Sequence, residues 1–343
     1  MGGRTRRRRF ETRRRQAIRL VAVLVVLLGA YSYWAIAVPM GKGQAKVISI
    51  ASGESAPAVA AQLEKAGLIR SRHAFLAYAY LTRRYGRLQA GGYRLEPDMS
   101  AAQILDVLYH GTHRAWRWLT LPEGYTVRQI ADAVDRAKLA TREEFLHATH
   151  LRRNPGFPLP ETGVEGYLFP DTYRVEWDEH APELADQMLR QFQRVVWEGL
   201  FGGKAEYRGR RVHDIVTLAS LVEAEAKHDH ERAVIAGVLM NRLRQGRRLE
   251  CDATVQYALG ADRKPRLLYK DLQLESEYNT YRHDGLPPGP ICNPGLASLA
   301  AAREPANVPY LYYVAKADGS HVFSTTFAEH TAAIARIRQG AGQ

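Results

Sequence analysis

Nineteen consecutive residues without a charged side chain, Leu20–Val38, constrain this chain more than any other feature. As an α-helix this segment is about 28 Å long at ~1.5 Å per residue, which is close to the hydrocarbon thickness of a bilayer. Tyr31, Tyr33 and Trp34 lie toward its far end, where aromatic rings favour the membrane interface. The sequence therefore predicts one transmembrane helix near the N-terminus, with the folded part of the chain beyond it.

A strongly basic tail precedes this segment. Residues 1–19 hold nine arginines against one glutamate, which accounts for +8 of the net charge of +12. Because basic residues flank the cytoplasmic end of membrane helices, we expect a cytoplasmic N-terminus and an exported remainder. A nucleic-acid-binding arm is one alternative, but the adjoining span already explains the arginines, so we expect no nucleic-acid partner. A cleaved signal peptide is another, since Ala35-Ile36-Ala37 resembles a cleavage site; the long apolar run and the bulky YSYW before it favour retention.

The remaining composition is that of a globular protein with a sizeable core. The 343 residues are 46% hydrophobic and 24% charged, and the length allows two folded units. Cys251 and Cys292 are too few for a disulfide scaffold, although in an oxidising compartment they can pair. His228-Asp229-His230 has no third ligand at a characteristic spacing, and alternate residues of a helix diverge. We therefore expect no metal site.

A pattern repeats at a constant offset of 71 residues, in 47–69 and 118–140. Each copy has a short strand, a glycine turn, a Ser or Thr N-cap and an amphipathic helix. Thr126 and Gln129 have capping-box spacing, as do Ser100 and Gln103 in a fainter third instance. The pattern resembles the LysM module, a small peptidoglycan-binding fold; the alternative is a β-α unit without a ligand. The identical positions are Gly53 and Gly124, Ala60 and Ala131, Ala66 and Ala137, and Leu68 and Leu139.

Beyond the repeat, the chain is expected to be mainly helical from about 190 to 245. The Gly- and Pro-rich segment 279–295 cannot be a helix or a central strand. Residues 310–325 predict a hairpin with its turn at 317–320, followed by a last short helix near His330. We therefore predict an α+β fold with this organisation: a basic tail (1–19), a transmembrane helix (20–38), a linker (39–45), a LysM-like module (46–115) and a larger mixed domain (116–340).

Two glutamates, Glu223 and Glu225, lie one residue apart in the helical segment LASLVEAEA. At 100° per residue, Glu223 falls at one edge of the apolar stripe and Glu225 near the other, roughly 160° away. On this helix alone they cannot be the two cooperating carboxylates of an ordinary glycosidase. From the pattern alone, either glutamate could instead cap a helix or pair with a cation, such as Lys227 for Glu223.

Five segments of unusual sequence follow one another along the chain. They are EGYLFPDTY (165–173), LASLVEAEA (218–226), VLMNRLRQGRRLECDATVQYALG (238–260), YNTYRHDGLPPGPICNPG (278–295) and YLYYVAKADGSHVFSTTFAEH (310–330). Together and in this order they closely resemble the endolytic murein transglycosylases of the YceG-like family. The resemblance covers about 46 to 340 and matches the single membrane anchor. It implies an enzyme that cuts peptidoglycan glycan strands internally, in the periplasm beside the bacterial inner membrane, in association with peptidoglycan synthases.

The resemblance implies that Glu223 is the catalytic acid and that Glu225 supports it. A lytic transglycosylase needs one carboxyl group, as acid to the glycosidic oxygen and then as base to the 6-hydroxyl of MurNAc. That hydroxyl attacks C1 and leaves a 1,6-anhydroMurNAc end. The resemblance implies no cofactor. The alternatives are a hydrolytic muramidase that uses Glu223 with a second carboxylate such as Glu165, and a non-catalytic peptidoglycan-binding scaffold.

The remaining candidates come from the same segments. Each can contact substrate or serve only the fold, because aromatic and polar side chains in such loops often pack or hold turns. Glu165, Asp171 and Asn279 are candidates for hydrogen bonds to sugar or peptide groups. Tyr167, Tyr173 and Tyr281 are candidates for stacking on sugar faces. Asn241, Arg242 and His321 complete the set.

Overall fold

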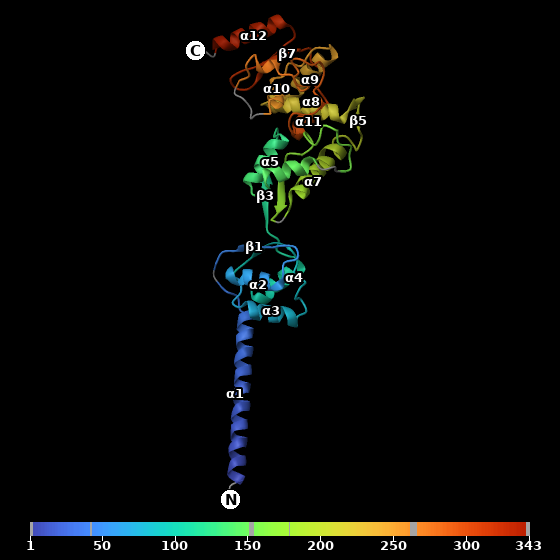
Figure 1. The fold of residues 1–343 in the computed structure, drawn as a ribbon. Coiled ribbons are helices and arrows are strands. Elements are labelled where there is room, and N and C mark those ends of the chain that lie inside the picture. Colours follow the sequence, from blue (N-terminus) through green and yellow to red (C-terminus); the bar gives the residue numbers. More distant parts are fainter. Residues whose placement is uncertain (1–2, 42, 151–153, 178, 261–265, 341–343) are drawn as a thin grey trace. The chain divides into compact units, whose positions relative to one another are not determined.

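The computed structural model describes residues 3–41, 43–150, 154–177, 179–260 and 266–340. It has two compact units, one formed by Met1–Arg117 with Arg174–Asp178, the other by Trp118–Tyr173 with Glu179–Gln343. The described part of the chain contains twelve α-helices and four two-stranded sheets (Figure 1). The predicted α+β class is therefore confirmed.

The first unit begins with the long helix α1 (Gly3–Ala37). By length and composition, its segment Ile18–Ala37 can cross a membrane, and most of that segment is exposed. The small module that follows has the order β1 (Lys46–Ile50), α2 (Ala56–Lys65), α3 (Arg72–Leu81), β2 (Gly91–Leu95) and α4 (Ala101–His110). β1 and β2 are antiparallel, and their inward side chains pack on the helices in a core that includes Leu63, Phe75, Tyr93, Ile104 and Leu108.

The predicted repeat is present in the backbone of both copies. β1 and α2 form the first copy, and β3 (Trp116–Thr120) and α5 (Val127–Arg136) form the second. Gly53 and Gly124 occupy equivalent turns with φ of 80° and 79°, the left-handed region that glycine favours. Both predicted capping boxes are formed. The strand, turn and helix of each copy thus follow from local sequence.

The second unit carries most of the helices. β3 pairs with β4 (Thr172–Glu176), and the other elements continue to the C-terminus. They are α6 (Arg142–His150), α7 (Ala181–Phe192) with a π-helical turn (Gln193–Glu198), the hairpin β5 (Glu206–Tyr207) and β6 (Arg210–Arg211), α8 (Val212–Glu225), α9 (Asp229–Arg244), α10 (Asp252–Ala258), a 3₁₀ turn (Asp271–Gln273), α11 (Leu296–Arg303), β7 (Tyr312–Ala315), β8 (His321–Ser324) and α12 (Phe327–Gly340).

Three helices, α8, α9 and α11, pack against one another at the centre of this unit. α8 is buried along most of its length, from Val212 to Val222. The predicted hairpin at 310–325 is formed by β7 and β8. The expectation of a mainly helical stretch from about 190 to 245 is confirmed, with one short hairpin, β5 and β6, after Gly202 and Gly203 turn the chain with positive φ. The last helix is longer than expected.

Candidate active site

Glu223 lies in the last turn of α8, and its side chain is only 8% exposed. Its Oε2 accepts a hydrogen bond from the backbone N–H of Gly295, at 3.0 Å. Gly295 is the N-cap of α11, so the carboxylate meets the positive end of that helix. The Arg232 guanidinium donates to Oε1 at 3.3 Å. These two donors hold one nearly buried carboxyl group in a fixed position.

Arg232, from α9, is itself held by two further groups. Its Nε donates to Asp229 at 3.0 Å and its Nη1 to the Ser298 hydroxyl at 2.6 Å. Burial lowers the pKa of Arg232, but the hydrogen bond to Asp229 and the charges of Glu223 and Asp229 outweigh burial and raise it. The guanidinium therefore stays charged beside Glu223.

A second carboxyl group, that of Glu123, lies at the same place. A Cβ on Gly295 would stand only 1.9 to 2.3 Å from the carboxyl atoms of Glu123, so the Glu123 carboxyl group lies directly against the Gly295 backbone. Partial loss of water raises the pKa of Glu123, the negative charge of Glu223 raises it further, and Arg232 opposes the rise. Glu123 is exposed, whereas Gly295 is buried. The site thus holds two interacting carboxyl groups, one nearly buried and one open to solvent.

Asn293 forms hydrogen bonds that connect the loop before α11 to the turn that carries Glu123. Its backbone O accepts from Gly124 N, and its backbone N donates to Tyr125 O, both at 2.9 Å. Its side chain donates to Tyr125 O at 2.9 Å and to Glu165 at 3.0 Å, and accepts from Leu168 N at 2.9 Å. The turn after β3 and the loop before α11 are therefore held together beside Glu223. Neither Glu123 nor Asn293 was among the candidates from the sequence.

Glu165 accepts a hydrogen bond from the first turn of α5. Its carboxyl oxygens accept from Val127 N at 3.0 and 3.2 Å, from the Asn293 amide, and from the Tyr257 hydroxyl at 3.4 Å. Val127 is the first residue of that helix, so Glu165 satisfies a donor that has no partner within the helix. Loss of water raises the pKa of Glu165 to about 8, although these hydrogen bonds oppose the rise.

Glu225 points to a different neighbour from Glu223, as the helical geometry predicts. Its Oε1 accepts from the Cys251 thiol at 3.0 Å. Burial, followed by the charge of Glu225, raises the pKa of Cys251 well above its ordinary value. Cys292 is also buried, and its thiol donates to Ser220 O at 3.4 Å. In the structure Cys251 and Cys292 are not joined by a disulfide.

Two of the candidate tyrosines lie in the core. Tyr167 is 2% exposed, stacks on Phe157 with ring centroids 5.9 Å apart, and shares a hydrogen bond of 2.9 Å with His213 Nδ1. Tyr173 is 5% exposed and donates to Phe169 O. Their ring faces are covered by protein, so in this structure neither offers a surface to a sugar.

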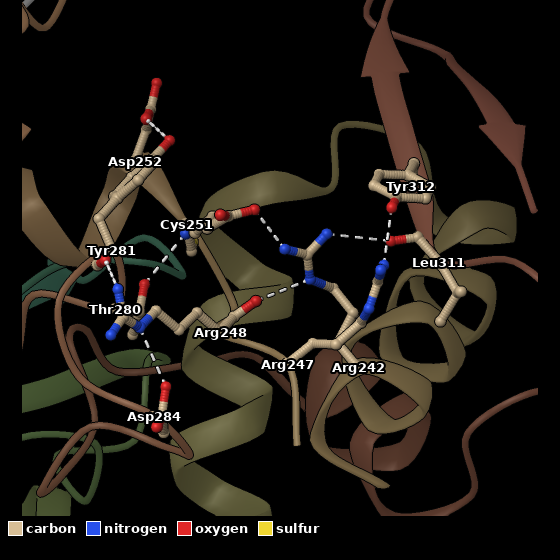
Figure 2. Close-up of polar contacts among 11 residues, drawn as sticks. Arg242, Arg247, Arg248, Cys251, Asp252, Thr280, Tyr281, Asp284, Leu311 and Tyr312 are labelled. Atoms are coloured by element: carbon tan, nitrogen blue, oxygen red, sulfur yellow. Dashed lines mark hydrogen bonds and ion pairs between the residues drawn. The ribbon is translucent and has the colours of Figure 1, made fainter. Parts of the chain in front are cut away.

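Three further candidates hold loops. Asp171 accepts from its neighbour Thr172 N at 2.7 Å and from Gln191 at 2.5 Å. Asn279 is fully buried, and its amide donates to two backbone carbonyls, Leu272 O at 3.0 Å and Leu274 O at 2.8 Å. The third, Tyr281, donates to Asp252 at 2.6 Å (Figure 2).

Asn241 and Arg242 join the end of α9 to the segments that follow. Asn241 donates to the carbonyls of Val308 and Tyr310 at 2.6 and 3.1 Å. Figure 2 shows Arg242 between Arg248 O, at 2.8 Å, and Leu311 O, at 3.2 Å. It also pairs with Glu250.

His321 pairs with Glu231, and both side chains are nearly buried. Its Nδ1 lies 2.7 Å from one carboxyl oxygen, and its backbone N donates to the other at 2.9 Å. Burial raises the pKa of Glu231, but these hydrogen bonds outweigh burial and lower it. This pair ties β8 to α9.

The residues of the HDH segment also have partners. Asp229 binds Arg232, and His228 Nε2 lies 3.1 Å from Asp318 O. Among the described residues, no group of three or more His, Cys, Asp or Glu side chains is arranged to hold a metal ion.

The family model described as the YceG-like family matches residues 48–336. The chain is 36% identical over 304 residues to a Bacillus subtilis protein named endolytic murein transglycosylase, covering 83% of each chain. A Streptococcus pneumoniae protein of the same name is 30% identical over 306 residues, covering 80% of this chain and 55% of the relative.

A solved structure shows the same fold. The 2.6 Å crystal structure of a putative YceG-like protein from Listeria monocytogenes matches with a TM-score of 0.56 and 32% identity. The match covers 84% of this chain and 98% of that one.

Proposed function

The chain belongs to the YceG-like family, and we propose that it is a lytic transglycosylase that cuts peptidoglycan glycan strands internally, between MurNAc and GlcNAc. The observation that carries this proposal is the state of Glu223. It is a nearly buried carboxyl group, held by Gly295 N–H and Arg232, with the carboxyl group of Glu123 beside it.

In the first step, protonated Glu223 gives its proton to the glycosidic oxygen as the bond from that oxygen to C1 of MurNAc breaks. The carboxylate that forms already has two donors in place, Gly295 N–H and Arg232. Because these donors need no rearrangement, they stabilise the new negative charge as it develops.

In the second step, the Glu223 carboxylate takes the proton of the MurNAc 6-hydroxyl, whose oxygen forms the new bond to C1. The product is a 1,6-anhydroMurNAc end, and Glu223 regains the proton that it gave. No water is consumed, and one carboxyl group performs both transfers.

Glu123 can hold a proton beside Glu223 while Glu223 is a carboxylate, and the two carboxyl groups can exchange that proton. Two neighbouring carboxylates repel each other, so such a pair keeps one proton that a lone carboxyl group would lose. The raised pKa of Glu123, caused by loss of water and by the charge of Glu223, is the sign of this interaction. The positive charge of Arg232 opposes this rise in the pKa of Glu123.

A hydrolytic muramidase is the second candidate, because a second carboxyl group beside Glu223 could activate a water molecule. That group is Glu123 rather than Glu165, whose oxygens serve α5. A non-catalytic scaffold is the third candidate.

Mass spectrometry of digested glycan strands separates the three candidates, with the wild type and Glu223→Gln run in parallel. We expect 1,6-anhydro ends from the wild type and none from the variant. Reducing ends without 1,6-anhydro ends would instead support the muramidase. Identical glycan profiles with and without the wild-type protein would support the scaffold.

The wider setting is part of the same proposal. α1 anchors the protein in the bacterial inner membrane as a single span, with the basic N-terminus in the cytoplasm and the second unit in the periplasm. There the enzyme limits the elongation of nascent strands in association with peptidoglycan synthases. The module of residues 46–115, with β1, α2, α3, β2 and α4, is the candidate LysM-like element that holds glycan. Protease protection in oriented membrane vesicles would test the orientation.

A further inference from the structure

The carboxyl end of α3 and the turn after it carry an exposed surface that combines apolar and cationic side chains. Tyr80 is 74% exposed, Leu81 79% and Tyr85 45%. The two tyrosine rings contact each other edge to face, with centroids 6.4 Å apart. Single exposed apolar residues are ordinary on protein surfaces, but a contiguous group of large ones marks an interaction site.

Two arginines flank these side chains. Arg83 and Arg87 are exposed, and no ion pair of either is seen among the described residues. Their neighbour Arg84 is instead committed to the fold, through Asp106 at 3.0 Å and the ring of Tyr109 at 5.1 Å. We define the α3 patch as Tyr80, Leu81, Arg83, Tyr85 and Arg87.

The depth of this patch relative to α1 can be read from contacts within the first unit. Ala35 of α1 is only 3% exposed, whereas Tyr33 and Trp34 are 71% and 48% exposed. α3 and α4 pack against α1, and Figure 1 shows α3 beside the carboxyl end of that helix. Ala35 lies about 3 Å before the end of the apolar segment at Ala37, at ~1.5 Å per residue. The module therefore contacts α1 within the last turn of the apolar segment.

Arg70 fixes this arrangement. It lies over the ring of Trp34, 4.4 Å from the centroid, and donates to Pro39 O at 2.6 Å and to Val38 O. These contacts join the segment just before α3 to the end of α1. The module is therefore held against the end of the apolar segment by packing as well as by the connecting chain.

We propose that the α3 patch inserts into the outer headgroup layer of the membrane that α1 spans and there binds anionic phospholipid. The proposal rests on the membrane anchoring proposed above. Tyrosine favours the interface between water and lipid, leucine favours the acyl boundary, and arginine pairs with lipid phosphates. The α3 patch offers all three on a helix that packs against α1 beside the end of the apolar segment. The module is then held on the bilayer at two places, by α1 and by the α3 patch.

Site-specific quenching by nitroxide-labelled lipids tests this on the full-length protein in vesicles that contain phosphatidylglycerol. A bimane fluorophore is attached at Leu81→Cys, at Leu27→Cys in α1, and at Phe327→Cys in the second unit. Leu27 and Phe327 are 61% and 67% exposed. The two native cysteines are buried, and wild-type protein treated in the same way gives the background. We expect strong quenching at 27 and 81 and none at 327.

The outcomes separate the α3 patch from the anchor. Quenching at 27 without quenching at 81 overturns the insertion of the α3 patch but is consistent with membrane anchoring by α1. Absence of quenching at both positions overturns both the insertion of the α3 patch and the anchoring by α1. Equal quenching at 81 and 327 overturns the α3 patch, because any exposed apolar side chain would then give the signal.

The arginines provide the test for anionic lipid. Arg83→Gln with Arg87→Gln, or vesicles of phosphatidylcholine alone, should reduce quenching at 81 and leave quenching at 27 unchanged. Unchanged quenching at 81 would overturn the binding of anionic lipid. Both arginines are exposed, so the double variant is expected to fold, and circular dichroism checks this.

Discussion

Glu165 and Glu223 occupy similar positions but have different surroundings. Each accepts a backbone N–H at the start of a helix, Glu165 from Val127 of α5 and Glu223 from Gly295 of α11. Glu165 accepts four hydrogen bonds, and these come from Val127, Asn293 and Tyr257. Glu223 accepts two and has the carboxyl group of Glu123 beside it. A carboxyl group whose acceptor sites are all occupied by donors of the protein is suited to stabilise the fold. A carboxyl group with fewer partners and an acidic neighbour is suited to exchange a proton.

The largest expected effect is on catalysis by Glu223→Gln. The amide cannot donate and regain the proton, so the rate of 1,6-anhydro end formation should fall on the order of 10³-fold. Glu225→Gln is the matched control, because Glu225 lies in the same helical turn and bonds to Cys251 instead. We expect the control to lose less than about tenfold, since it removes no proton donor from the reaction. Comparable losses in both variants would end the distinction between the two glutamates.

Glu123→Gln should have the next largest effect, about a tenfold lower rate at neutral pH. Removing the negative charge next to Glu223 removes the repulsion that keeps a proton on the pair. The alkaline limb of the pH–rate profile should therefore move to lower pH. Glu161→Gln, at an exposed glutamate, is the matched control, and its profile should coincide with that of the wild type. A Glu123→Gln profile that also coincides with the wild type would remove Glu123 from the site.

Glu165 should affect stability and its pH dependence more than catalysis. Its pKa is raised to about 8, mainly by loss of water, so the native state keeps a proton that the unfolded chain loses near pH 4.5. The unfolding free energy gained from this group is complete below about pH 4.5 and falls as pH rises toward 8. Urea unfolding between pH 5 and 8 should show this decline in the wild type and a flatter dependence in Glu165→Gln. Equal slopes would contradict the assignment.

The smallest effects are expected at Cys251. Cys251→Ser keeps a donor to Glu225, whereas Cys251→Val removes it and should lower the unfolding free energy by about 1–3 kcal/mol. Neither variant should change the rate of 1,6-anhydro end formation more than a few-fold. Thermal unfolding and the product assay check the two parts separately. A large loss of activity in Cys251→Ser, with unchanged stability, would connect Glu225 to the reaction.

Local features of the fold could be predicted from the sequence because short-range physics sets them. Ser55 and Thr126 cap their helices, and Gly53 and Gly124 turn the chain, as the repeat indicates. The divergence of Glu223 and Glu225 follows from 100° per residue alone.

The partners within the site could not be predicted, because they depend on contacts between distant segments. Glu123 reaches Glu223 only because Asn293 fastens the turn after β3 to the loop before α11. In the sequence, Glu123 belongs to a turn and shows no periodicity that marks it. Tyr167 and Tyr173 were candidates for contact with substrate, but both rings are buried. The sequence of a loop does not reveal whether a ring packs inward.

The central claim is that Glu223 exchanges a proton while Glu165 holds α5 in place. Measuring both the rate of 1,6-anhydro end formation and the unfolding free energy at pH 5 in Glu223→Gln and Glu165→Gln tests it most directly. We predict that Glu223→Gln loses on the order of 10³-fold in rate even where it is fully folded, with a loss of about 1–3 kcal/mol of stability because Arg232 loses its charged partner. Glu165→Gln should lose about 1–3 kcal/mol of stability and less than about tenfold in rate. A Glu223→Gln variant that still forms 1,6-anhydro ends at the wild-type rate would contradict the account.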